Sequence, residues 1–490
     1  MMLQRAHWAA TAFATYDRAR VHRIVEAVAG AAHANAERYA EWAVRETGMG
    51  VVEHKRLKNE ACSRGILEAY ADHDLVGARV DRERRIVELP RPAGVVLALT
   101  PSTNPVATVY FKVLLSLLTR NAVVVSPHPL ARECCVDAAR LLAGAAVAAG
   151  APDGCVQVVE EPTIPLVEAL MEDPRTNVIL ATGGVGVVRA AYRSGNPAIG
   201  VGPGNVPVLV DATADLGRAA RCIADSKSFD NSILCTNESV LIAEERIADR
   251  LVQALAAEGA HLLAADDVAR VRETLFPGGR LDVALIGKDA QAIAGAAGVR
   301  VPARTRVLLA PFDLVVPEEP LAREKMAPVL GLVRVADARR GIDAARAVLR
   351  IGGAGHSAAI HSTDPTTILA FGAAVPVLRV AVNAGGSTGS AGIGTGLPIS
   401  MTIGTGFFGR SSLGKNLEPD DLVHWTRAAY TSDPAVPFGD FEGLDPWSAM
   451  PAPVPVPTAA GAPAGGASDE LRDEVRRLLL EELRDLIGSR

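Results

Sequence analysis

The feature that most constrains the fold of this 490-residue chain is an alternation of short apolar runs with longer segments of helical periodicity. Runs rich in valine and isoleucine occupy residues 94–100, 121–126, 155–160 and 176–184. Fully apolar strands that alternate with helices are typical of a parallel sheet covered on both faces. The pattern therefore predicts a Rossmann-like α/β unit, preceded by helices over residues 1 to about 80.

The alternation starts again after the Gly/Pro-rich stretch GVGPGNVP. It predicts a second α/β unit, and a glycine-rich segment then returns to the first unit as loops. The expected organisation has five parts: helices and the first α/β unit over 1–204, the second α/β unit over 205–385, the return segment over 386–447, a flexible linker over 448–468 and an amphipathic helix over 469–490.

The last two parts differ from the rest in composition. The linker is rich in Pro, Ala and Gly and has too few large apolar side chains to build a core. The final helix carries one apolar stripe: Leu471, Val475, Leu478, Leu479, Leu483, Leu486 and Ile487. A short tethered helix is marginal alone in water, so we expect it to dock into a groove of another protein. The alternative is an ordinary terminal helix that docks on its own subunit.

Composition and charge argue against several classes of protein. The net charge of −6 is spread along the chain, so no basic face for nucleic acid is expected. The chain contains no run of 18 apolar residues, so no membrane span is predicted. The N-terminus lacks the apolar core of a secretory signal. The six cysteines contain no CxxC pair, which predicts neither a metal site nor a disulfide framework. These features favour a reducing, cytoplasmic setting.

A cysteine in an apolar run is more often a small buried hydrophobe than a nucleophile. That interpretation is kept for five of the six: Cys62, Cys134, Cys135, Cys155 and Cys222. Cys235 differs, because the stretch around it, VGPGNVPVLVDATADLGRAARCIADSKSFDNSILCTNE, resembles the aldehyde dehydrogenase superfamily. The resemblance is to its CoA-acylating branch, the acetaldehyde and propionaldehyde dehydrogenases of bacterial microcompartments. TPSTNPVATV, NAVVVSPHPLA, EKMAPVLGLVRV and GGAGHSAAIHS extend it over roughly residues 5 to 435.

The resemblance implies roles for three residues at the reacting centre. Cys235 matches the nucleophile that attacks the aldehyde carbonyl. Asn104 matches the side-chain donor to the resulting oxyanion, although without the family it is a turn residue before a proline. Val201 stands where hydrolytic relatives carry a glutamate that activates water. A valine cannot take a proton, so the acyl group on the cysteine is expected to wait for the CoA thiol.

The resemblance also implies a nicotinamide dinucleotide site in the first α/β unit, with the catalytic thiol in the second and an oligomerising element in the return segment. The residues assigned to the cofactor are Thr100, Pro101, Ser126, His128, Thr182, Gly183, Gly184 and Glu324. As a bare pattern TGGVGVVRAA is weak, because it is not GxGxxG. Many relatives carry a lysine near Ser126, and no basic residue stands there for a 2′-phosphate. NAD is therefore favoured, and NADP is left open.

Two of the residues that the resemblance singles out have ordinary alternatives. Glu324 matches the glutamate that holds the nicotinamide ribose, and without the family it is a solvated helix charge. His356, in GAGHS, falls in a family motif near the active site, and it is equally well interpreted as a structural histidine.

The function that these features favour is oxidation of a short aldehyde with NAD and CoA to an acyl-CoA, by a homodimer or homotetramer. The C-terminal helix over 469–490 resembles the encapsulation peptides that bind shell proteins, which predicts a place in the lumen of a bacterial microcompartment. Three alternatives stay open: a hydrolytic aldehyde dehydrogenase, a sulfoacetaldehyde-type acylating enzyme and a non-catalytic scaffold. Acetaldehyde and propionaldehyde are the leading substrates, and lactaldehyde or methylglyoxal is left open.

Overall fold

The computed structural model of the chain describes residues 1–444, 446 and 447. The described residues fall in one compact unit. The linker predicted at 448–468 and the helix predicted at 469–490 lie outside the described residues. Within the described part, no helix is both long enough and apolar enough to cross a membrane.

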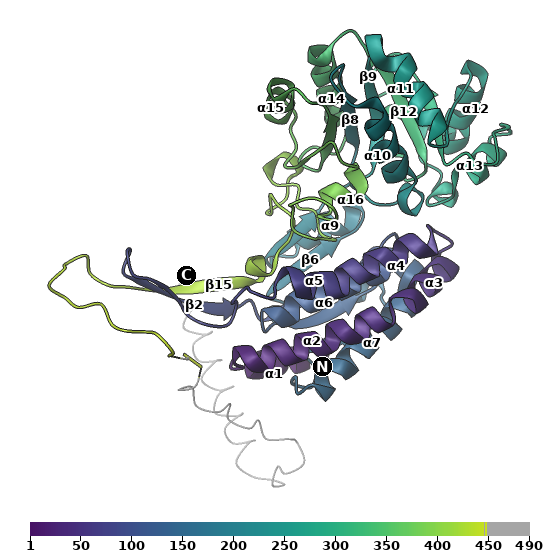
Figure 1. Ribbon diagram of the computed structural model, residues 1–490. Coiled ribbons are helices and arrows are strands. Elements are labelled where there is room, and N and C mark those ends of the chain that lie inside the picture. The colour runs from purple at the N-terminus through teal and green to yellow at the C-terminus, as the bar shows by residue number, and fades with distance from the viewer. Residues whose placement is uncertain (445, 448–490) are drawn as a thin grey trace, which may run out of the picture. The chain divides into compact units, whose positions relative to one another are not determined.

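Helices open the chain, as predicted (Figure 1). They are α1 (Met2–Phe13), α2 (Arg18–Ala34), α3 (Ala36–Thr47), α4 (Val52–Glu60) and, after one π-turn, α5 (Ile66–Ala69). Asp17 caps α2 by accepting from the Arg20 N–H, and Gly48 ends α3 in the left-handed conformation that glycine adopts without strain. Their buried faces pack onto the first sheet in one continuous apolar core.

A five-stranded parallel sheet forms the first α/β unit. Its strands are β3 (Val95–Leu99), β4 (Ala122–Ser126), β5 (Val156–Val158), β6 (Val178–Thr182) and β7 (Ala198–Val201), in the order β5-β4-β3-β6-β7. The connecting helices are α6 (Pro105–Leu118), α7 (Arg132–Ala148), α8 (Ile164–Glu172) and α9 (Val185–Arg193). This order matches that of the first five strands of a Rossmann fold and places the carboxyl ends of all five strands at one edge. Four of the strands were predicted; β7 was missed.

A seven-stranded parallel sheet forms the second unit, in the order β10-β11-β12-β9-β8-β13-β14. Figure 1 labels three of its strands, β8, β9 and β12. The strands are β8 (Val206–Val210), β9 (Glu238–Glu244), β10 (Ala260–Leu262), β11 (Val307–Pro311), β12 (Val329–Val335), β13 (Ala358–His361) and β14 (Val380–Val382). Its helices are α10 (Leu216–Ser228), α11 (Glu245–Ala257), α12 (Ala265–Leu275), α13 (Ala290–Ala296), α14 (Ala338–Ile351) and α15 (Pro365–Ala374). Separate apolar clusters cover its two faces, which confirms the predicted α/β class.

A small antiparallel sheet joins a segment that follows the N-terminal helices to a segment near the end of the described chain. It contains β1 (Arg79–Asp81), β2 (Ile86–Pro92) and β15 (Val423–Ala429), with β2 in the middle. Between β14 and β15 the chain forms α16 (Gly386–Ser390) and loops. These loops contact the first sheet, where the Ser411 hydroxyl donates to the Gly200 carbonyl at 2.7 Å.

Candidate active site

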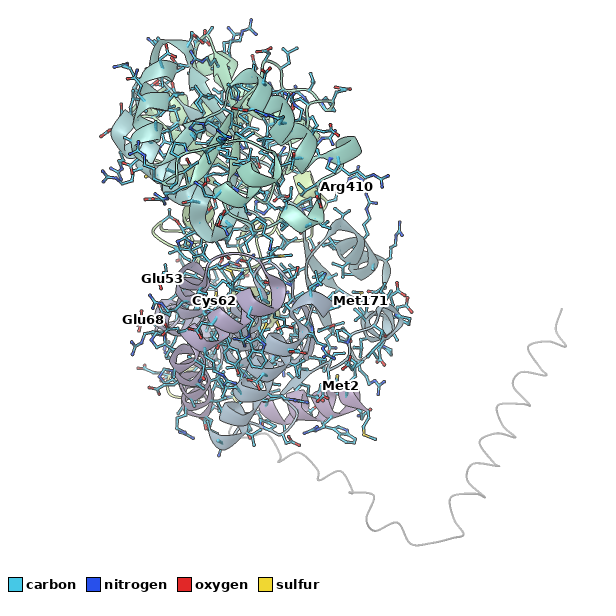
Figure 2. All side chains as sticks on the ribbon, turned by 90° about the vertical axis from the view of Figure 1, so that its right-hand side faces the viewer. Met2, Glu53, Cys62, Glu68, Met171 and Arg410 are labelled. Atoms are coloured by element: carbon cyan, nitrogen blue, oxygen red, sulfur yellow. The ribbon has the colours of Figure 1, made fainter. Side chains whose placement is uncertain are left out.

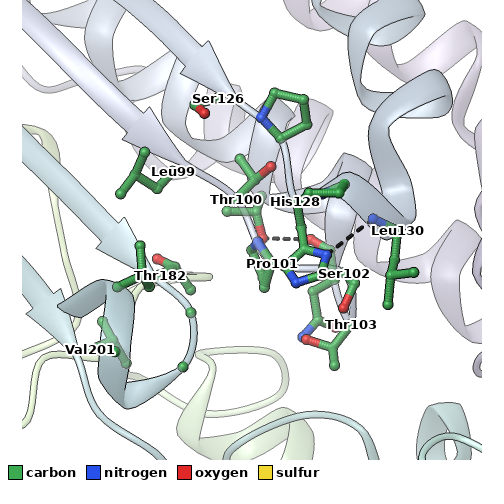
Figure 3. Close-up of a pocket in the computed structure, with 18 of the residues that line it drawn as sticks. Leu99, Thr100, Pro101, Ser102, Thr103, Ser126, His128, Leu130, Thr182 and Val201 are labelled. Carbon is green, nitrogen blue, oxygen red and sulfur yellow. Dashed lines mark hydrogen bonds between the residues drawn. The ribbon is translucent and has the colours of Figure 1, made fainter. Parts of the chain in front are cut away.

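One large cavity collects residues from both parallel sheets. Its volume is about 850 Å³, a size typical of sites for small ligands and cofactors. The first sheet contributes the carboxyl ends of β3, β4, β6 and β7, the edge at which parallel α/β sheets bind ligands. Figure 3 shows Leu99, Thr182 and Val201 on one side of this space and His128 and Leu130 on the other.

Cys235 lines the cavity from the turn between α10 and β9. Just before it, residues 230–232 have φ values of 48°, 51° and 68°. The left-handed conformation costs a residue other than glycine roughly 1–2 kcal/mol, so surrounding contacts must hold it. Asp230 supplies two of them. Its Oδ1 accepts from the Val51 N–H at 2.7 Å, and its own N–H donates to His54 Nδ1 at 2.8 Å.

The residues that follow Cys235 are fixed equally firmly. Thr236 donates its hydroxyl to the Ser387 carbonyl at 2.7 Å. The Asn237 amide donates to the Ser387 hydroxyl at 3.0 Å and accepts from the buried Lys227 ammonium at 2.7 Å. Polar contacts therefore hold the turn on both sides of the thiol, as a preorganised nucleophile requires.

Gly204 brings the link between the two sheets against the backbone of Cys235. A Cβ atom at Gly204 would lie 1.9 Å from the Cys235 carbonyl oxygen, so only glycine permits this approach. The GPGN sequence between β7 and β8 thus sets where the thiol lies relative to the first sheet.

The pKa of the Cys235 thiol is raised to about 12. Burial is the main cause, and the Glu324 carboxylate adds to it, while Arg379 and Lys58 act in the opposite direction. Without a ligand the thiol is therefore protonated at neutral pH, and it must lose its proton to become a nucleophile.

Asn104 lines the same cavity, immediately before Pro105 at the first position of α6. Its Oδ1 accepts from the Lys58 ammonium at 2.5 Å, and its Nδ2 donates to the Thr103 hydroxyl at 3.3 Å. The structure thus brings both predicted catalytic residues, Cys235 and Asn104, to one cavity.

All eight residues predicted to contact the cofactor also line this cavity. The Thr100 hydroxyl is buried and has no hydrogen-bond partner among the described residues, so a ligand atom would satisfy it. His128 Nδ1 accepts from the Leu130 N–H at 3.2 Å (Figure 3). Gly183 and Gly184 come directly before α9, and free backbone N–H groups at a helix start favour a phosphate. These features fit a dinucleotide.

Glu324 lines the cavity from the loop before β12. Burial raises the pKa of its carboxyl group to about 8, against the opposing charges of Lys227 and Lys325. This environment differs from that of the solvated helix charge that the sequence offered as the alternative.

His356 is the predicted site residue that does not line the cavity. It is fully buried, its Nδ1 lies 3.0 Å from the Ser357 hydroxyl, and burial together with Arg379 lowers its pKa to about 3. The structure therefore shows a neutral imidazole inside the second unit. Its predicted place near the active site stays a prediction.

The cavity wall carries few charged side chains. Among the lining residues that the structure describes, none is lysine or arginine, and the carboxylates are Glu168 and Glu324. In the described part of the chain, no group of three His, Cys, Asp or Glu side chains could hold a metal ion.

Comparison with known proteins places this cavity in a family. The aldehyde dehydrogenase family model matches residues 1–274. The chain belongs to the aldehyde dehydrogenase family.

Curated relatives cover most of this aldehyde dehydrogenase. The acetylating succinate-semialdehyde dehydrogenase of Clostridium kluyveri is 35% identical over 88% of the chain and 95% of its own length. The acylating sulfoacetaldehyde dehydrogenase of Cupriavidus necator is 35% identical, with 90% and 91% covered. The bifunctional aldehyde-alcohol dehydrogenase AdhE of Escherichia coli is also 35% identical, over 86% of the chain and 48% of AdhE. The chain thus spans about half the length of that bifunctional relative.

Solved structures agree with the fold of this aldehyde dehydrogenase. An acetylating aldehyde dehydrogenase from Geobacillus thermoglucosidasius has a TM-score of 0.86 at 37% identity, covering 88% of this chain and 95% of that one. A propionaldehyde dehydrogenase from a fucose-utilisation microcompartment of Clostridium phytofermentans gives 0.80 at 29%, covering 87% and 96%. A Rhodopseudomonas palustris propionaldehyde dehydrogenase with bound CoA and an acylated cysteine gives 0.80 at 29%, covering 88% and 96%. The predicted aldehyde dehydrogenase fold, and the resemblance to acylating members, are confirmed.

Sequence reasoning missed two sets of residues: one that lines the cavity of this aldehyde dehydrogenase, and one that lies outside the lining. The first is an apolar wall: Met49, Ile233, Ile286, Met326 and Met401. The second is a pair of buried lysines on α4, Lys55 and Lys58, beside Asn104 and Asp230. No motif marks either set. Two lysines three residues apart on a short helix look like an ordinary solvated face in a single sequence.

Proposed function

We propose that this aldehyde dehydrogenase is CoA-acylating and converts a short-chain aldehyde, a nicotinamide dinucleotide and CoA to an acyl-CoA. The observation that carries the proposal is that Val201 and Cys235 line one cavity. An apolar side chain stands in the place that the resemblance assigns to the water-activating glutamate. The thioester on the cysteine therefore lacks the base that hydrolysis would use at that position.

In the proposed mechanism the Cys235 thiol first loses its proton to solvent, and its thiolate then attacks the aldehyde carbon, so that the carbonyl oxygen becomes an alkoxide. The Asn104 amide and the Cys235 N–H donate to that alkoxide, and donors fixed in advance stabilise such charge strongly. A nicotinamide held by the residues assigned to the cofactor would take up the hydride as the alkoxide reforms a carbonyl, and a thioester would remain on Cys235. The CoA thiolate then attacks the thioester carbon, and the Cys235 sulfur leaves.

The rival reaction is hydrolysis of the thioester, which needs a base in the cavity. Glu324 lines the cavity and titrates near neutrality, so it is the described carboxylate that a hydrolytic enzyme could use instead of the missing glutamate. The resemblance gives Glu324 a different role, which is contact with the cofactor. The two reactions differ in whether turnover needs CoA.

The deciding experiment measures NADH formation from aldehyde and NAD⁺ with and without CoA. We expect multiple turnovers only with CoA, and at most one turnover per site without it. Cys235→Ala should abolish both. Full turnover without CoA would support the hydrolytic enzyme, and an active Cys235→Ala variant would remove Cys235 from the mechanism.

Substrate and cofactor preference follow from the charge of the cavity wall. A sulfonate, a substrate carboxylate or a 2′-phosphate binds more strongly beside a cationic side chain, and no lysine or arginine is among the described lining residues. We therefore favour NAD over NADP, and acetaldehyde or propionaldehyde over sulfoacetaldehyde. Values of kcat/KM for a panel of aldehydes, with each cofactor and with CoA present, test both preferences. A higher kcat/KM for sulfoacetaldehyde would reverse the substrate proposal.

We further propose that the enzyme is a homo-oligomer and microcompartment cargo, recruited through residues 469–490. The linker composition, the apolar stripe and the solved microcompartment relative support this proposal. Deleting residues 448–490 should leave catalysis in solution intact and abolish co-purification with a shell protein. Loading that survives the deletion would show that the tail does not carry it.

A further inference from the structure

Two lysines of α4 reach the turn that carries the candidate nucleophile. Lys55 and Lys58 are both buried, and both ammonium groups contact the fully buried Asp230 carboxylate. The Lys55 pair spans 3.2 Å. Figure 2 locates this helix by Glu53, on its first turn, and Cys62, just beyond its end. The cluster has one more positive than negative group, so it leaves a positive charge in a dry environment.

The two lysines divide their remaining contacts between neighbouring residues. Lys55 donates to the backbone carbonyl of Thr103 at 3.0 Å, whereas Lys58 donates to the Asn104 side chain at 2.5 Å. An ammonium group only donates hydrogen bonds, so the Asn104 atom that faces Lys58 must be the amide oxygen. The chemistry of Lys58 therefore settles which way the amide points.

In this orientation one N–H of Asn104 is left to donate to the alkoxide. The amide nitrogen carries two N–H groups, and one donates to the Thr103 hydroxyl at 3.3 Å. The other has no hydrogen bond among the described residues and belongs to a side chain that lines the cavity with Cys235. An amide free to rotate would spend part of its time with its oxygen towards the alkoxide and would repel it.

The charge of Lys58 acts in the same sense. Donation to the amide oxygen polarises the carboxamide and makes its N–H groups stronger donors. The ammonium is also one of two cations that favour the charged form of the Cys235 sulfur. Both effects stabilise negative charge at the place where the mechanism develops it.

We propose that Lys58 is a positioning residue of the oxyanion site: it holds the Asn104 carboxamide by its oxygen so that an N–H faces the alkoxide formed at Cys235. The inference rests on the proposed function, since it requires an alkoxide at that thiol. It assigns to the N-terminal helices a part in the chemistry of the second unit.

The test is a double-mutant cycle between Lys58→Met and Asn104→Ala, with Lys55→Met as the matched control. Each lysine variant leaves Asp230 paired with the other lysine, so both should fold. A neighbouring cavity of about 10 Å³, which Lys55, Lys58 and Asn104 help to line, gives the methionines room to adjust. Lys58→Gln, which keeps an amide N–H at this position, repeats the cycle if the methionine variant is insoluble.

We expect Lys58→Met to lower kcat by about 10- to 100-fold in the wild-type background, because loss of one oxyanion donor costs about 10²–10³. The same change in the Asn104→Ala background should lower kcat by less than about threefold, since groups that act as a unit are not additive. The KM for NAD⁺ should stay unchanged in every variant. Lys55→Met should keep kcat within about threefold of wild type, even if its Tm falls.

Equal losses in both backgrounds, or a Lys55→Met loss as large as that of Lys58→Met, would overturn the positioning role in an active enzyme. Absence of CoA-dependent turnover in the wild-type protein would instead count against the proposed function. The two failures are therefore distinguishable.

Discussion

The Cys235 thiol lies among groups with opposing effects on its proton. Burial and Glu324 favour the neutral thiol, and Arg379 and Lys58 favour the thiolate. The balance raises the pKa to about 12, so the thiol of the free enzyme is protonated at neutral pH.

This balance predicts the pH dependence of Cys235 alkylation. Below its pKa, a thiol gains thiolate about tenfold for each pH unit, so the rate with iodoacetamide should still be rising at pH 9.5 to 10. A free thiol such as glutathione, measured in parallel, should level off in that range because its pKa is lower. Mass spectrometry of the Cys235 peptide reports the rate. A plateau at neutral pH would show that the thiol is already activated in the free enzyme.

Val201 offers a change that adds function. Val201→Glu places a carboxylate at the end of β7, in the cavity that Cys235 lines, and a positioned base typically contributes about 10²–10⁴-fold. We expect NADH formation without CoA to rise at least about tenfold. Val201→Gln has the same shape but a far weaker base and serves as the matched control. Equal gains in both variants would mean that the added bulk, and not the base, releases the acyl group.

At the scale of single residues, the sequence predicted site residues that lie far apart along the chain. Cys235, Asn104 and the eight residues that the resemblance assigns to the cofactor line one cavity. Lys58 escaped because its importance lies in a contact 46 residues along the chain, with Asn104. A tertiary contact of that kind leaves no periodic trace in one sequence.

The link between the two parallel sheets is the element that places the thiol. Gly204→Ala would put a methyl group against the Cys235 carbonyl, and a backbone atom cannot move aside cheaply. We expect kcat to fall by at least about tenfold, because an error of about 1 Å in catalytic geometry can cost 10²-fold. Gly295→Ala on α13, where no atom lies within 4 Å of the added methyl, is the control and should keep full activity. Normal activity of Gly204→Ala would show that the turn shifts without consequence.

Strands were predicted where their sequence pattern was strong and missed where it was weak. The strands buried on both faces, such as β3 and β4, were readable because all their residues except Ser126 are apolar. β7, with the sequence AIGV, was lost in the Gly/Pro-rich link that follows it. β15 was lost because most of its residues are exposed and it pairs with a strand more than 300 residues earlier.

Trp447, the last residue that the structure describes, is held against the body of the protein by its indole ring. Its indole N–H donates to the Val76 carbonyl at 2.7 Å, and the Arg120 guanidinium lies 4.3 Å from the ring centroid. A chain ending after Trp447 should keep the Tm of the full-length protein. Trp447→Ala should lower the Tm by a few degrees, because truncating a buried tryptophan costs about 3–5 kcal/mol. Differential scanning calorimetry of both variants measures this, and an unchanged Tm in Trp447→Ala would show that the contact is dispensable.

The pairing of β2 with β15 has a consequence for biosynthesis. Arg91 and Thr426, which meet across this pair, are 335 residues apart. At about 5–20 residues per second, a ribosome needs roughly 20 to 70 s to make the intervening chain. For that time one edge of β2 has no partner, even though the helices and the first sheet around it have emerged. The nascent protein therefore presents an open strand edge throughout the synthesis of its second unit, and this edge is where chaperones would be needed.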